Sequence, residues 1–343
     1  MISLMLAGGI ALWVSVLSTP ILIRWLTRKR IGQHVREDGP QQHLAKAGTP
    51  TMGGGAMLAA VVLGFGLAHV DHVAFTRSGY LVLGATVAFG VIGFLDDWIK
   101  VRHRRSLGLN KRAKFGAQVL IAVAFGLLAE HWAGVDTHLS FTWATSIQLG
   151  SVGWLVLAVV VMVGTSNAVN LTDGLDGLAS GSATFCFAVL AIMGYWQFRH
   201  PKIYHVLPAL DLALMAVALA GACLGFLWWN AAPAKIFMGD TGSLALGSGL
   251  GALCLLMNLQ LLLIIIGGLF VVITLSVVIQ VISFRVFGRR VFRMAPLHHH
   301  FELAGWPETT VIVRFWILAG LFAALGLGIF YAEFLTTPGQ GIL

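Results

Sequence analysis

Residues 80–100 read YLVLGATVAFGVIGFLDDWIK, a long apolar run that ends in two adjacent aspartates. Residues 80–95 contain no charged side chain, whereas residues 100–114 contain seven Lys or Arg. An uncharged run followed by a basic segment is typical of a membrane-spanning helix and its cytoplasmic loop. At the boundary, Asp96 and Asp97 indicate either a cation site for phosphate chemistry or a turn or helix cap.

The composition of the whole chain supports a membrane protein. Its 343 residues are 58% hydrophobic and 10% charged, and the mean hydropathy is +0.86. Soluble domains are about 45–50% apolar and about 25% charged, so this chain has too little polar surface to cover a globule. We therefore expect an all-α polytopic membrane protein in one domain, residues 1–343. Three cysteines lie inside apolar runs, which favours buried hydrophobic residues over a disulfide or zinc site: Cys186, Cys223 and Cys254.

Ten apolar segments approach the length of about 17–25 residues that crosses a bilayer. They cover approximately residues 3–26, 53–70, 79–95, 115–132, 150–168, 178–197, 211–229, 243–258, 261–284 and 311–333. The loops that follow segments 1, 3, 5, 7 and 9, called odd-numbered here, lie on one side if the loops alternate between the two sides. Of the 22 Lys and Arg, all except Arg77, Arg199 and Lys202 then fall in these loops or their flanks. The positive-inside rule then puts the odd-numbered loops in the cytoplasm and both termini outside. This asymmetry explains the net charge of +8 without nucleic-acid binding.

Between the fourth and fifth segments, Leu139, Phe141 and Trp143 alternate with polar residues. Alternation with a period of two is typical of a β-strand. We therefore expect a short hairpin at the outer surface.

The cytoplasmic loops carry the polar motifs. Asn167, Asn170, Asp173 and Asp176 recur every three residues after the fifth segment, so they would line one side of a helix or tight turn. Amides, carboxylates and nearby glycines suit binding of a sugar or base and of a hydrated metal ion, and a connecting turn is the alternative. The Gly-, Thr- and Pro-rich residues 46–55 fit either a phosphate-binding loop or a flexible connector.

Two further motifs follow. Asp240 lies between glycines at the cytoplasmic edge of the eighth segment, and Phe237 precedes it by three residues, a place from which an aromatic ring can stack on a base. His298–His300 is an internal run of histidines. On a helix of about 3.6 residues per turn the three rings spread over about 200°, so one ion cannot take all three. Acid–base or phosphate-binding work is the functional interpretation, and a solvated turn is the alternative.

All of these groups fall on one side of the membrane. Ionisable groups beside hydrocarbon are costly and usually functional. Carboxylates and amides without a thiolate favour Mg²⁺ over zinc or copper. A magnesium site beside basic and glycine-rich loops indicates phosphoryl transfer between a soluble nucleotide and a lipid acceptor. The competing class is a secondary transporter, which would place its charges near the bilayer midplane.

Five motifs, in order along residues 24–320, closely resemble the phospho-N-acetylmuramoyl-pentapeptide-transferase (MraY) family. They are KAGTPTMGG (46–54), GFLDD (93–97), NAVNLTDGLDG (167–177), FMGD (237–240) and MAPLHHHFE (294–302). The acidic motifs are shared with the wider polyprenyl-phosphate N-acetylhexosamine-1-phosphate transferase superfamily. The triple-histidine motif and the GTPTMG loop narrow the resemblance to the muramoyl branch.

The resemblance implies a homodimeric enzyme of the bacterial inner membrane, with ten spans and its active site on the cytoplasmic side. With Mg²⁺ it would transfer phospho-N-acetylmuramoyl-pentapeptide from UDP-MurNAc-pentapeptide to undecaprenyl phosphate in the lipid bilayer. The products would be UMP and lipid I, used in peptidoglycan synthesis. A sibling enzyme that transfers N-acetylglucosamine 1-phosphate is the alternative within the superfamily.

At matching positions, the resemblance implies that Asp240 and Asp97 hold the metal and that Asp96 orients or deprotonates the lipid phosphate. The implied catalytic residues are these three and His298, His299 and His300. Because the lipid phosphate is already ionised near neutral pH, we expect Asp96 mainly to orient it and the attack to be direct, without a covalent intermediate.

The resemblance also implies a set of substrate-binding residues. Gly174, Leu175, Asp176 and Phe237 would form the uracil pocket. Lys100 and Lys114 would lie near the phosphates. Within the basic residues 100–114, Lys111 is the alternative to Lys114 for this role. The full set is Lys46, Thr51, Lys100, Lys114, Asn170, Asp173, Gly174, Leu175, Asp176, Asn230, Phe237 and Gln280.

Overall fold

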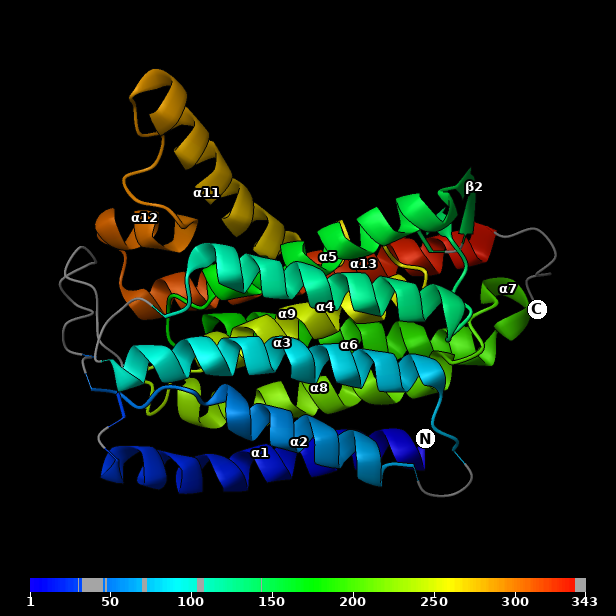
Figure 1. Ribbon diagram of the computed structural model, residues 1–343, viewed down its shortest axis with the longest axis horizontal. Coiled ribbons are helices and arrows are strands. Elements are labelled where there is room, and N and C mark those ends of the chain that lie inside the picture. The colour runs from blue at the N-terminus through cyan, green and yellow to red at the C-terminus, as the bar shows by residue number, and fades with distance from the viewer. Residues whose placement is uncertain are drawn as a thin grey trace.

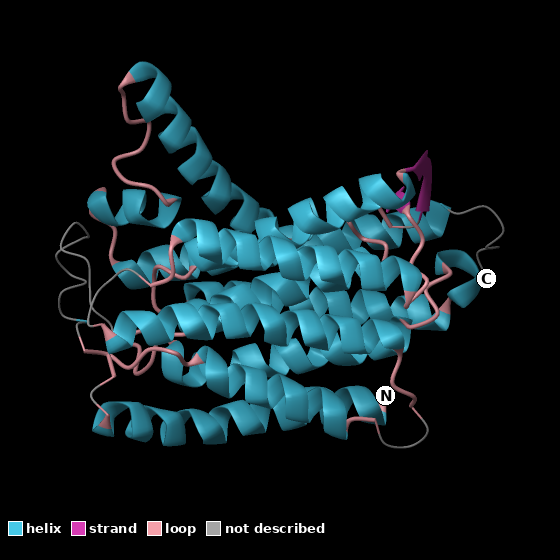
Figure 2. Cartoon of the chain, viewed as in Figure 1, coloured by secondary structure: helices cyan, strands magenta, loops and turns pink. Residues whose placement is uncertain are grey.

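The computed structural model describes residues 1–29, 31–32, 46, 48–69, 73–103, 108–142 and 144–336. Most of these residues are helical, and long helices pack side by side into a bundle (Figure 1, Figure 2). The all-α prediction is confirmed. The long helices are α1 (Ile2–Arg28), α2 (Gly54–Leu67), α3 (Arg77–Arg102), α4 (Lys111–His131), α5 (Gly150–Thr172), α6 (Leu178–Arg199), α8 (Ala209–Asn230), α9 (Gly239–Leu256), α11 (Gly268–Phe287) and α13 (Glu308–Thr336).

Within the described ranges, eight helices are long and apolar enough to cross a membrane: α1, α3, α4, α5, α6, α8, α11 and α13. The chain is therefore a polytopic membrane protein. Helices α2 and α9 occupy the positions of the second and eighth predicted spans, with 14 and 18 residues. The count of ten spans stays a prediction.

The ninth predicted span, residues 261–284, begins too early. The chain there forms the short helix α10 (Leu263–Ile266), breaks at Gly267 and continues as α11 from Gly268. Two successive glycines disfavour an unbroken helix, because glycine loses the most backbone entropy when it becomes helical. Helix α11 then leans out of the bundle, and the short helix α12 (Leu297–Leu303) follows it (Figure 1).

The two ends of the bundle differ. Strands β1 (His138–Ser140) and β2 (Ala144–Gln148) pair antiparallel, which confirms the predicted hairpin between α4 and α5. Trp143, part of the predicted alternation, lies outside the described residues. The N-terminus, helix α7 (Pro201–Tyr204) and the end of α13 lie at the same end as the hairpin (Figure 1). The opposite end, called the motif end below, comprises the last turns of α3 and α5, the first turn of α9, and α12.

The centre of the bundle is closely packed. Every residue of α9 from Thr241 to Leu256 is buried, and many of them are Gly, Ala or Ser. Small side chains let helices in a membrane approach one another closely. A Cβ added at Gly93 of α3 would lie 2.1 Å from the Asp240 carbonyl oxygen. Helices α3 and α9 are therefore in near backbone contact next to the acidic motifs.

Apolar side chains are distributed as a membrane protein requires. The outer helices expose large hydrophobic side chains, such as Trp13 of α1 and Phe284 of α11, which lipid covers in a bilayer. The three cysteines are buried and form no disulfide, as expected. A second apolar cluster joins the start of α6 to α11 and α13 near the motif end; it contains Leu175, Leu178, Leu269, Ile273, Val311, Ile312, Phe315 and Ala319.

Candidate active site

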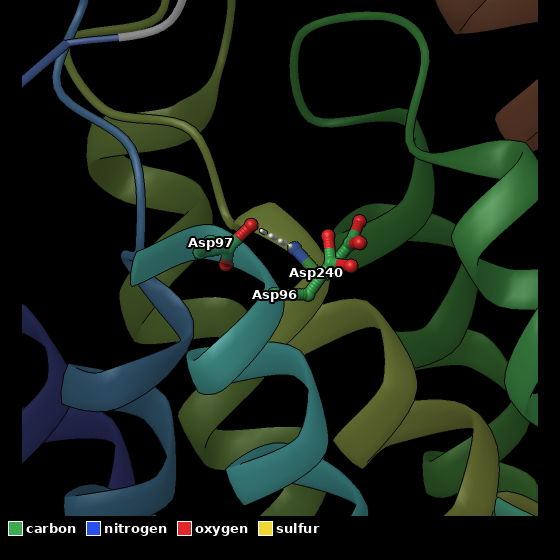
Figure 3. A group of neighbouring side chains, drawn as sticks. All are labelled: Asp96, Asp97 and Asp240. Carbon is green, nitrogen blue, oxygen red and sulfur yellow. Dashed lines mark hydrogen bonds between the residues drawn. The ribbon is translucent and has the colours of Figure 1, made fainter. Parts of the chain in front are cut away.

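Three carboxylates meet at the motif end. Asp96 and Asp97 come from the last turns of α3, and Asp240 comes from the first turn of α9 (Figure 3). One carboxylate oxygen from each residue lies within 4.8 Å of the others. Asp96 and Asp97 are each only 3% exposed, so their charges are shielded from bulk water. Carboxylate oxygens at this spacing suit a hard divalent cation.

Asp97 also holds the start of α9. Its Oδ1 accepts the Asp240 N–H at 3.2 Å, and its Oδ2 accepts the N–H and the hydroxyl of Thr241 at 3.0 and 2.7 Å. The first N–H groups of a helix lack partners within the helix, and a carboxylate satisfies them favourably. Gly239 permits this approach, because its φ is +72° and an added Cβ would lie 2.5 Å from Asp97 Oδ2. Asp97 lies inside α3, so it forms no turn and does not cap its own helix. It binds the first N–H groups of another helix, α9, and also belongs to the acidic cluster of Asp96, Asp97 and Asp240.

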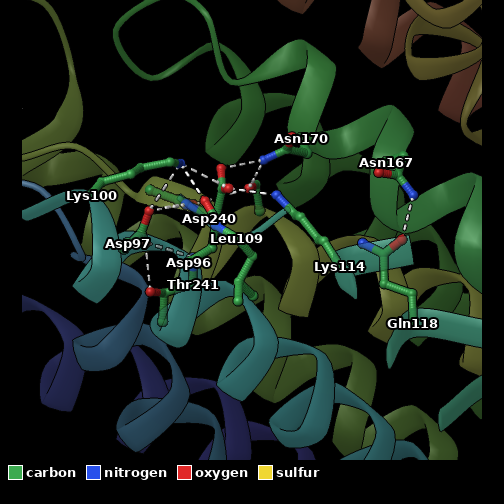
Figure 4. A network of polar contacts seen from close by, with 12 residues as sticks. Asp96, Asp97, Lys100, Leu109, Lys114, Gln118, Asn167, Asn170, Asp240 and Thr241 are labelled. Atoms are coloured by element: carbon green, nitrogen blue, oxygen red, sulfur yellow. Dashed lines mark hydrogen bonds and ion pairs between the residues drawn. The ribbon is translucent and has the colours of Figure 1, made fainter. Parts of the chain in front are cut away.

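Two lysines neutralise part of this negative charge. Lys100 Nζ lies 2.6 Å from Asp96 Oδ2 and 2.9 Å from Asp240 Oδ2. Lys114 Nζ of α4 lies 2.5 Å from the same Asp240 oxygen (Figure 4). Lys111 is exposed at the start of α4. Of Lys111 and Lys114, the structure therefore places Lys114 at the acidic cluster, beside Lys100.

Asp96 is bonded through both carboxylate oxygens. Its Oδ2 faces Lys100, and its Oδ1 accepts the Leu109 N–H at 2.9 Å. Leu109 lies in the segment between α3 and α4, part of which, with Arg104 and Arg105, lies outside the described residues. The two adjacent aspartates thus differ: Asp97 binds the start of α9, and Asp96 binds the α3–α4 segment.

The polar row at the end of α5 divides into two parts. Asn170 Nδ2 donates to Asp240 Oδ1 and to Ser243 Oγ, both at 2.8 Å. One turn earlier, Asn167 Nδ2 donates to Gln118 Oε1 of α4 at 2.9 Å (Figure 4). Asn170 therefore belongs to the acidic cluster, whereas Asn167 belongs to the contact between α4 and α5.

Asp173 follows the last residue of α5. Burial, and then the negative charges of Asp240, Asp97 and Asp176, raise the pKa of its carboxyl to about 8. In cation-free protein this carboxyl is therefore protonated near neutral pH. A cation bound at the acidic cluster would offset the negative charge and lower the pKa of Asp173. The protonation of Asp173 thus responds to the charge of the cluster.

A second polar group forms where the segment before α2 meets α13. Lys46 Nζ lies 2.6 Å from Asp176 Oδ1 and 2.5 Å from Glu308 Oε1. Asp176 Oδ2 accepts the Ala234 N–H at 2.9 Å. Burial alone would lower the pKa of the Lys46 ammonium, but the hydrogen bonds and charges of the two carboxylates raise this pKa above 10.5. The structure thus brings Lys46 and Asp176 together. Glu308, which lies outside the sequence motifs, is a third member of this polar group.

Backbone hydrogen bonds join the Gly-rich loop to the segment before α9. The Phe237 N–H donates to the Pro50 carbonyl at 2.8 Å, and the Gly53 N–H donates to the Phe237 carbonyl at 2.9 Å. Thr51 lies between these bonds and is 9% exposed. The flexible-connector interpretation does not fit residues 50–53, because the backbone groups of Pro50 and Gly53 are bonded to Phe237.

Two residues that the resemblance placed at the substrate bind backbone groups in this structure. Asn230 is 2% exposed, and its Nδ2 donates to the Ile236 carbonyl at 2.9 Å. Gln280 Oε1 accepts the N–H groups of Val291 and Phe292 at 3.0 and 2.9 Å. Each side chain therefore holds a loop of the motif end.

The three histidines of α12 have different surroundings. The His298 ring packs against the α5–α6 turn, since a Cβ added at Gly174 would lie 2.3 Å from His298 Nε2. His299 Nδ1 lies 2.6 Å from Glu302 Oε2. His300 Nδ1 accepts a backbone N–H from the preceding loop at 3.1 Å. The three side chains thus have different partners, although the rings of His298 and His299 are in contact with centroids 4.3 Å apart. His298 contacts Gly174, a residue implied to form the uracil pocket.

Sequence reasoning missed two side chains that hold the site residues. Thr241 follows Asp240 in the first turn of α9, where an acid is typical. Glu308 follows Pro307 and stands in the first turn of α13, where proline and an acid are typical. These signals predict the starts of two helices. They do not predict that Thr241 reaches Asp97 or that Glu308 reaches Lys46.

The sequence is similar to those of known proteins along nearly its whole length. A family model described as glycosyl transferase family 4 matches residues 80–258. The phospho-N-acetylmuramoyl-pentapeptide-transferase of Frankia alni is 52% identical over 347 residues, which cover 97% of this chain and 98% of the relative. The protein of that name from Saccharopolyspora erythraea is 53% identical over 352 residues, with coverage of 97% and 98%. The chain belongs to the phospho-N-acetylmuramoyl-pentapeptide-transferase family.

Proposed function

We propose that the chain transfers phospho-N-acetylmuramoyl-pentapeptide from UDP-MurNAc-pentapeptide to undecaprenyl phosphate, giving lipid I and UMP for peptidoglycan synthesis. The observation that carries this proposal is the contact of Lys100 and Lys114 with the three-carboxylate cluster. The reaction brings two anionic phosphates together, so charge neutralisation and positioning supply most of the rate. The ammonium groups of Lys100 and Lys114, together with a cation held by the three carboxylates, would neutralise and position the two phosphates.

We propose that Mg²⁺ binds at the acidic cluster. Asp240 and Asp97 would hold it, and Asp96 is close enough to offer a third oxygen. Three carboxylates without a thiolate or imidazole are a donor set that favours Mg²⁺ over Zn²⁺. When bound, the ion would stabilise the negative charge that develops on the diphosphate. Lys100 and Lys114, which now contact Asp240 Oδ2, would become available to phosphate oxygens.

Asp96 is proposed to orient the acceptor phosphate. Contacts with Lys100 and the Leu109 N–H hold its carboxylate in place, which suits a group that positions its neighbours. An oxygen of undecaprenyl phosphate forms a bond to the phosphorus next to the sugar. The bond between this phosphorus and the oxygen that bridges the two phosphorus atoms of the donor breaks, and UMP leaves with that oxygen. We propose that these events form one direct displacement.

The donor is proposed to bind between the Gly-rich loop, the α5–α6 turn and α12. The contacts of Asp176 with Lys46 and of Gly174 with His298 support this arrangement. The uracil pocket would contain Gly174, Leu175, Asp176 and Phe237. The sugar and diphosphate would be surrounded by Lys46, Thr51, Lys100, Lys114, Asn170, Asp173, Asn230, Gln280, His298, His299 and His300, and the histidines would supply any acid–base or phosphate-binding work.

We propose that the motif end faces the cytoplasm of a bacterial inner membrane. Lys100 and Lys114 at this end and the arginines after α11 give it the positive charge that favours the cytoplasmic side. A soluble nucleotide donor would also be supplied from that side. A homodimer, implied by the family resemblance, is part of the proposal.

The test is UMP release by the purified protein with Mg²⁺ and undecaprenyl phosphate. UDP-MurNAc-pentapeptide and UDP-N-acetylglucosamine are supplied in separate reactions, and UMP and the lipid product are measured by chromatography and mass spectrometry. We expect turnover with the first donor. Turnover with the second donor alone would assign the sibling activity, and UMP from neither would overturn the proposal. Trapping of a phosphosugar adduct on Asp96 or Asp97 would contradict direct displacement.

A further inference from the structure

Glu308, the first residue of α13, joins two parts of the site that are distant in sequence. Its Oε1 lies 2.5 Å from Lys46 Nζ and accepts the Asp176 N–H at 3.2 Å. One carboxylate oxygen thus binds a side chain that precedes α2 and the backbone of the α5–α6 turn. The side chains of Glu308, Lys46 and Asp176 are 18%, 21% and 4% exposed, so water screens these contacts only in part.

The first turns of α13 hold the same α5–α6 turn at further points. Trp316 Nε1 donates to the Gly177 carbonyl at 3.3 Å. The Leu175 side chain belongs to the apolar cluster that contains Val311 and Ile312 of α13. Glu308 therefore extends from a packed support, and its carboxylate has a defined position relative to the turn.

The charge balance of this group matters for a nucleotide ligand. The single ammonium of Lys46 faces two carboxylates, Asp176 and Glu308. If Lys46 turned fully to a phosphate, the two acids would be left without a cation, which is costly when they are shielded from water. Asp176 Oδ1 could then accept a hydrogen bond from a base N–H, while Glu308 kept its bond to the Asp176 N–H. Binding of a base at Asp176 and of a phosphate at Lys46 would thereby be linked through Glu308.

We propose that Glu308 is a positioning residue for the nucleotide part of the donor. It holds Lys46 and the Asp176 turn in the relative placement that binds a base and a diphosphate together. Its effect reaches the donor through these two residues. The inference rests on the proposed function, since it requires a UDP-linked donor.

The experiment compares Glu308→Ala and Glu308→Gln in the purified full-length protein with Mg²⁺. Gln keeps the side-chain length and an acceptor for the Asp176 N–H but removes the charge that faces Lys46. We expect the KM of the UDP-linked donor to rise about tenfold or more in Glu308→Ala, the loss expected for charge-assisted hydrogen bonds. The rise should be smaller in Glu308→Gln, with kcat within about threefold and the KM of undecaprenyl phosphate unchanged.

Binding of UMP, measured by calorimetry, provides a second readout and should weaken in parallel. A matched control is Glu333→Gln at the other end of α13, where Glu333 accepts a hydrogen bond from the Thr142 hydroxyl. This variant should leave both KM values unchanged. In the Lys46→Ala background, Glu308→Ala should add less to the donor KM than it does alone, because Glu308 acts partly through Lys46.

The outcomes separate this inference from the proposed function. A wild-type enzyme that releases UMP, together with a Glu308→Ala variant of unchanged donor KM and UMP affinity, would overturn the inference alone. An equal rise in both KM values with a fall in thermal stability would show a merely structural role and overturn it too. A wild-type protein that neither releases nor binds UMP would overturn the proposed function, and the inference with it.

Discussion

Asp97 Oδ2 accepts two hydrogen bonds from Thr241, one from the backbone N–H at 3.0 Å and one from the hydroxyl at 2.7 Å. The contact caps the first turn of α9. Because Asp240 is the residue before Thr241, the same contact sets the place of the third carboxylate of the acidic cluster. Asp97 therefore links the start of this helix to the position of Asp240 in the acidic cluster.

Replacing Asp97 should cost stability as well as activity. In Asp97→Ala the first N–H groups of α9 lose a charged acceptor, a loss of about 1–3 kcal/mol for a buried donor. We expect turnover to fall below detection and the melting temperature in detergent to fall further than in Asp96→Ala. Thermal unfolding and UMP release measure the two effects.

Thr241 supplies the control for this prediction. Thr241→Ser keeps the hydroxyl donor and should melt close to wild type, whereas Thr241→Val should melt lower. Equal melting temperatures for Asp97→Ala and Asp96→Ala would show that Asp97 does not hold the start of α9.

Lys114 and Lys111 form a matched pair for testing the basic run. Lys114 Nζ contacts Asp240 Oδ2 at 2.5 Å, whereas Lys111 is exposed at the start of the same helix. Loss of a cation that stabilises transition-state charge typically costs about 100-fold or more in kcat. We expect that loss in Lys114→Ala and a change of less than about threefold in Lys111→Ala. UMP release measures both, and comparable losses would contradict the placement.

The sequence predicted the helical membrane architecture well because hydrocarbon imposes a strong constraint: backbone groups must bond within helices. Charges beside long apolar runs are conspicuous, and three of the acids found in this way, Asp96, Asp97 and Asp240, lie together in the structure. The hairpin was found from its alternation. The break at Gly267 was not, because an apolar run shows no boundary where the helix stops and restarts.

Side-chain partners were harder to predict. Asn167 and Asn170 have the same spacing in the polar row, yet one bonds to Gln118 and the other to Asp240. That difference arises from which helix packs against each turn of α5, which is a tertiary property. Glu308 was missed for the same reason, because its partner Lys46 is 262 residues away in the sequence.

The two asparagines give a further prediction. Asn170→Ala removes a donor to Asp240 Oδ1 at 2.8 Å and should lower kcat by about tenfold or more. Asn167→Ala should instead lower the melting temperature and keep most of the turnover, because Asn167 joins α5 to α4. Parallel measurement of kcat and thermal unfolding separates the two effects. A loss of turnover in Asn167→Ala at unchanged stability would place this residue in the site after all.

Removal of divalent cations should stop the reaction. Treatment with EDTA is expected to abolish UMP release in the wild type, and added Mg²⁺ should restore it, because the three-carboxylate cluster offers hard oxygen ligands. In Asp240→Asn, which leaves one carboxylate fewer, Mg²⁺ should not restore turnover. Binding of Mn²⁺, followed by paramagnetic resonance, should weaken in parallel. Full turnover in EDTA would exclude the metal assignment.

The raised pKa of the Asp173 carboxyl predicts how the stability of the cation-free protein depends on pH. Its carboxyl has a pKa of about 8 in the folded protein, against an ordinary value of 3.8. Between pH 3.8 and about 8 the folded state keeps a proton on Asp173 that the unfolded state has released. The contribution of Asp173 to folding stability is therefore full below pH 3.8 and is lost as the pH rises through about 8. In EDTA, the melting temperature of Asp173→Asn minus that of the wild type should therefore rise with pH and level off above about 8.

Added Mg²⁺ provides the control for the pH experiment. A cation at the acidic cluster offsets the charges of Asp240 and Asp97 that help to raise the pKa of Asp173. The pH dependence of the melting-temperature difference should therefore flatten when Mg²⁺ is present. A difference that is constant with pH in EDTA would show that the Asp173 carboxyl does not keep its proton in the folded protein. A difference that varies with pH equally with and without Mg²⁺ would show instead that Asp173 lies outside the field of the bound cation.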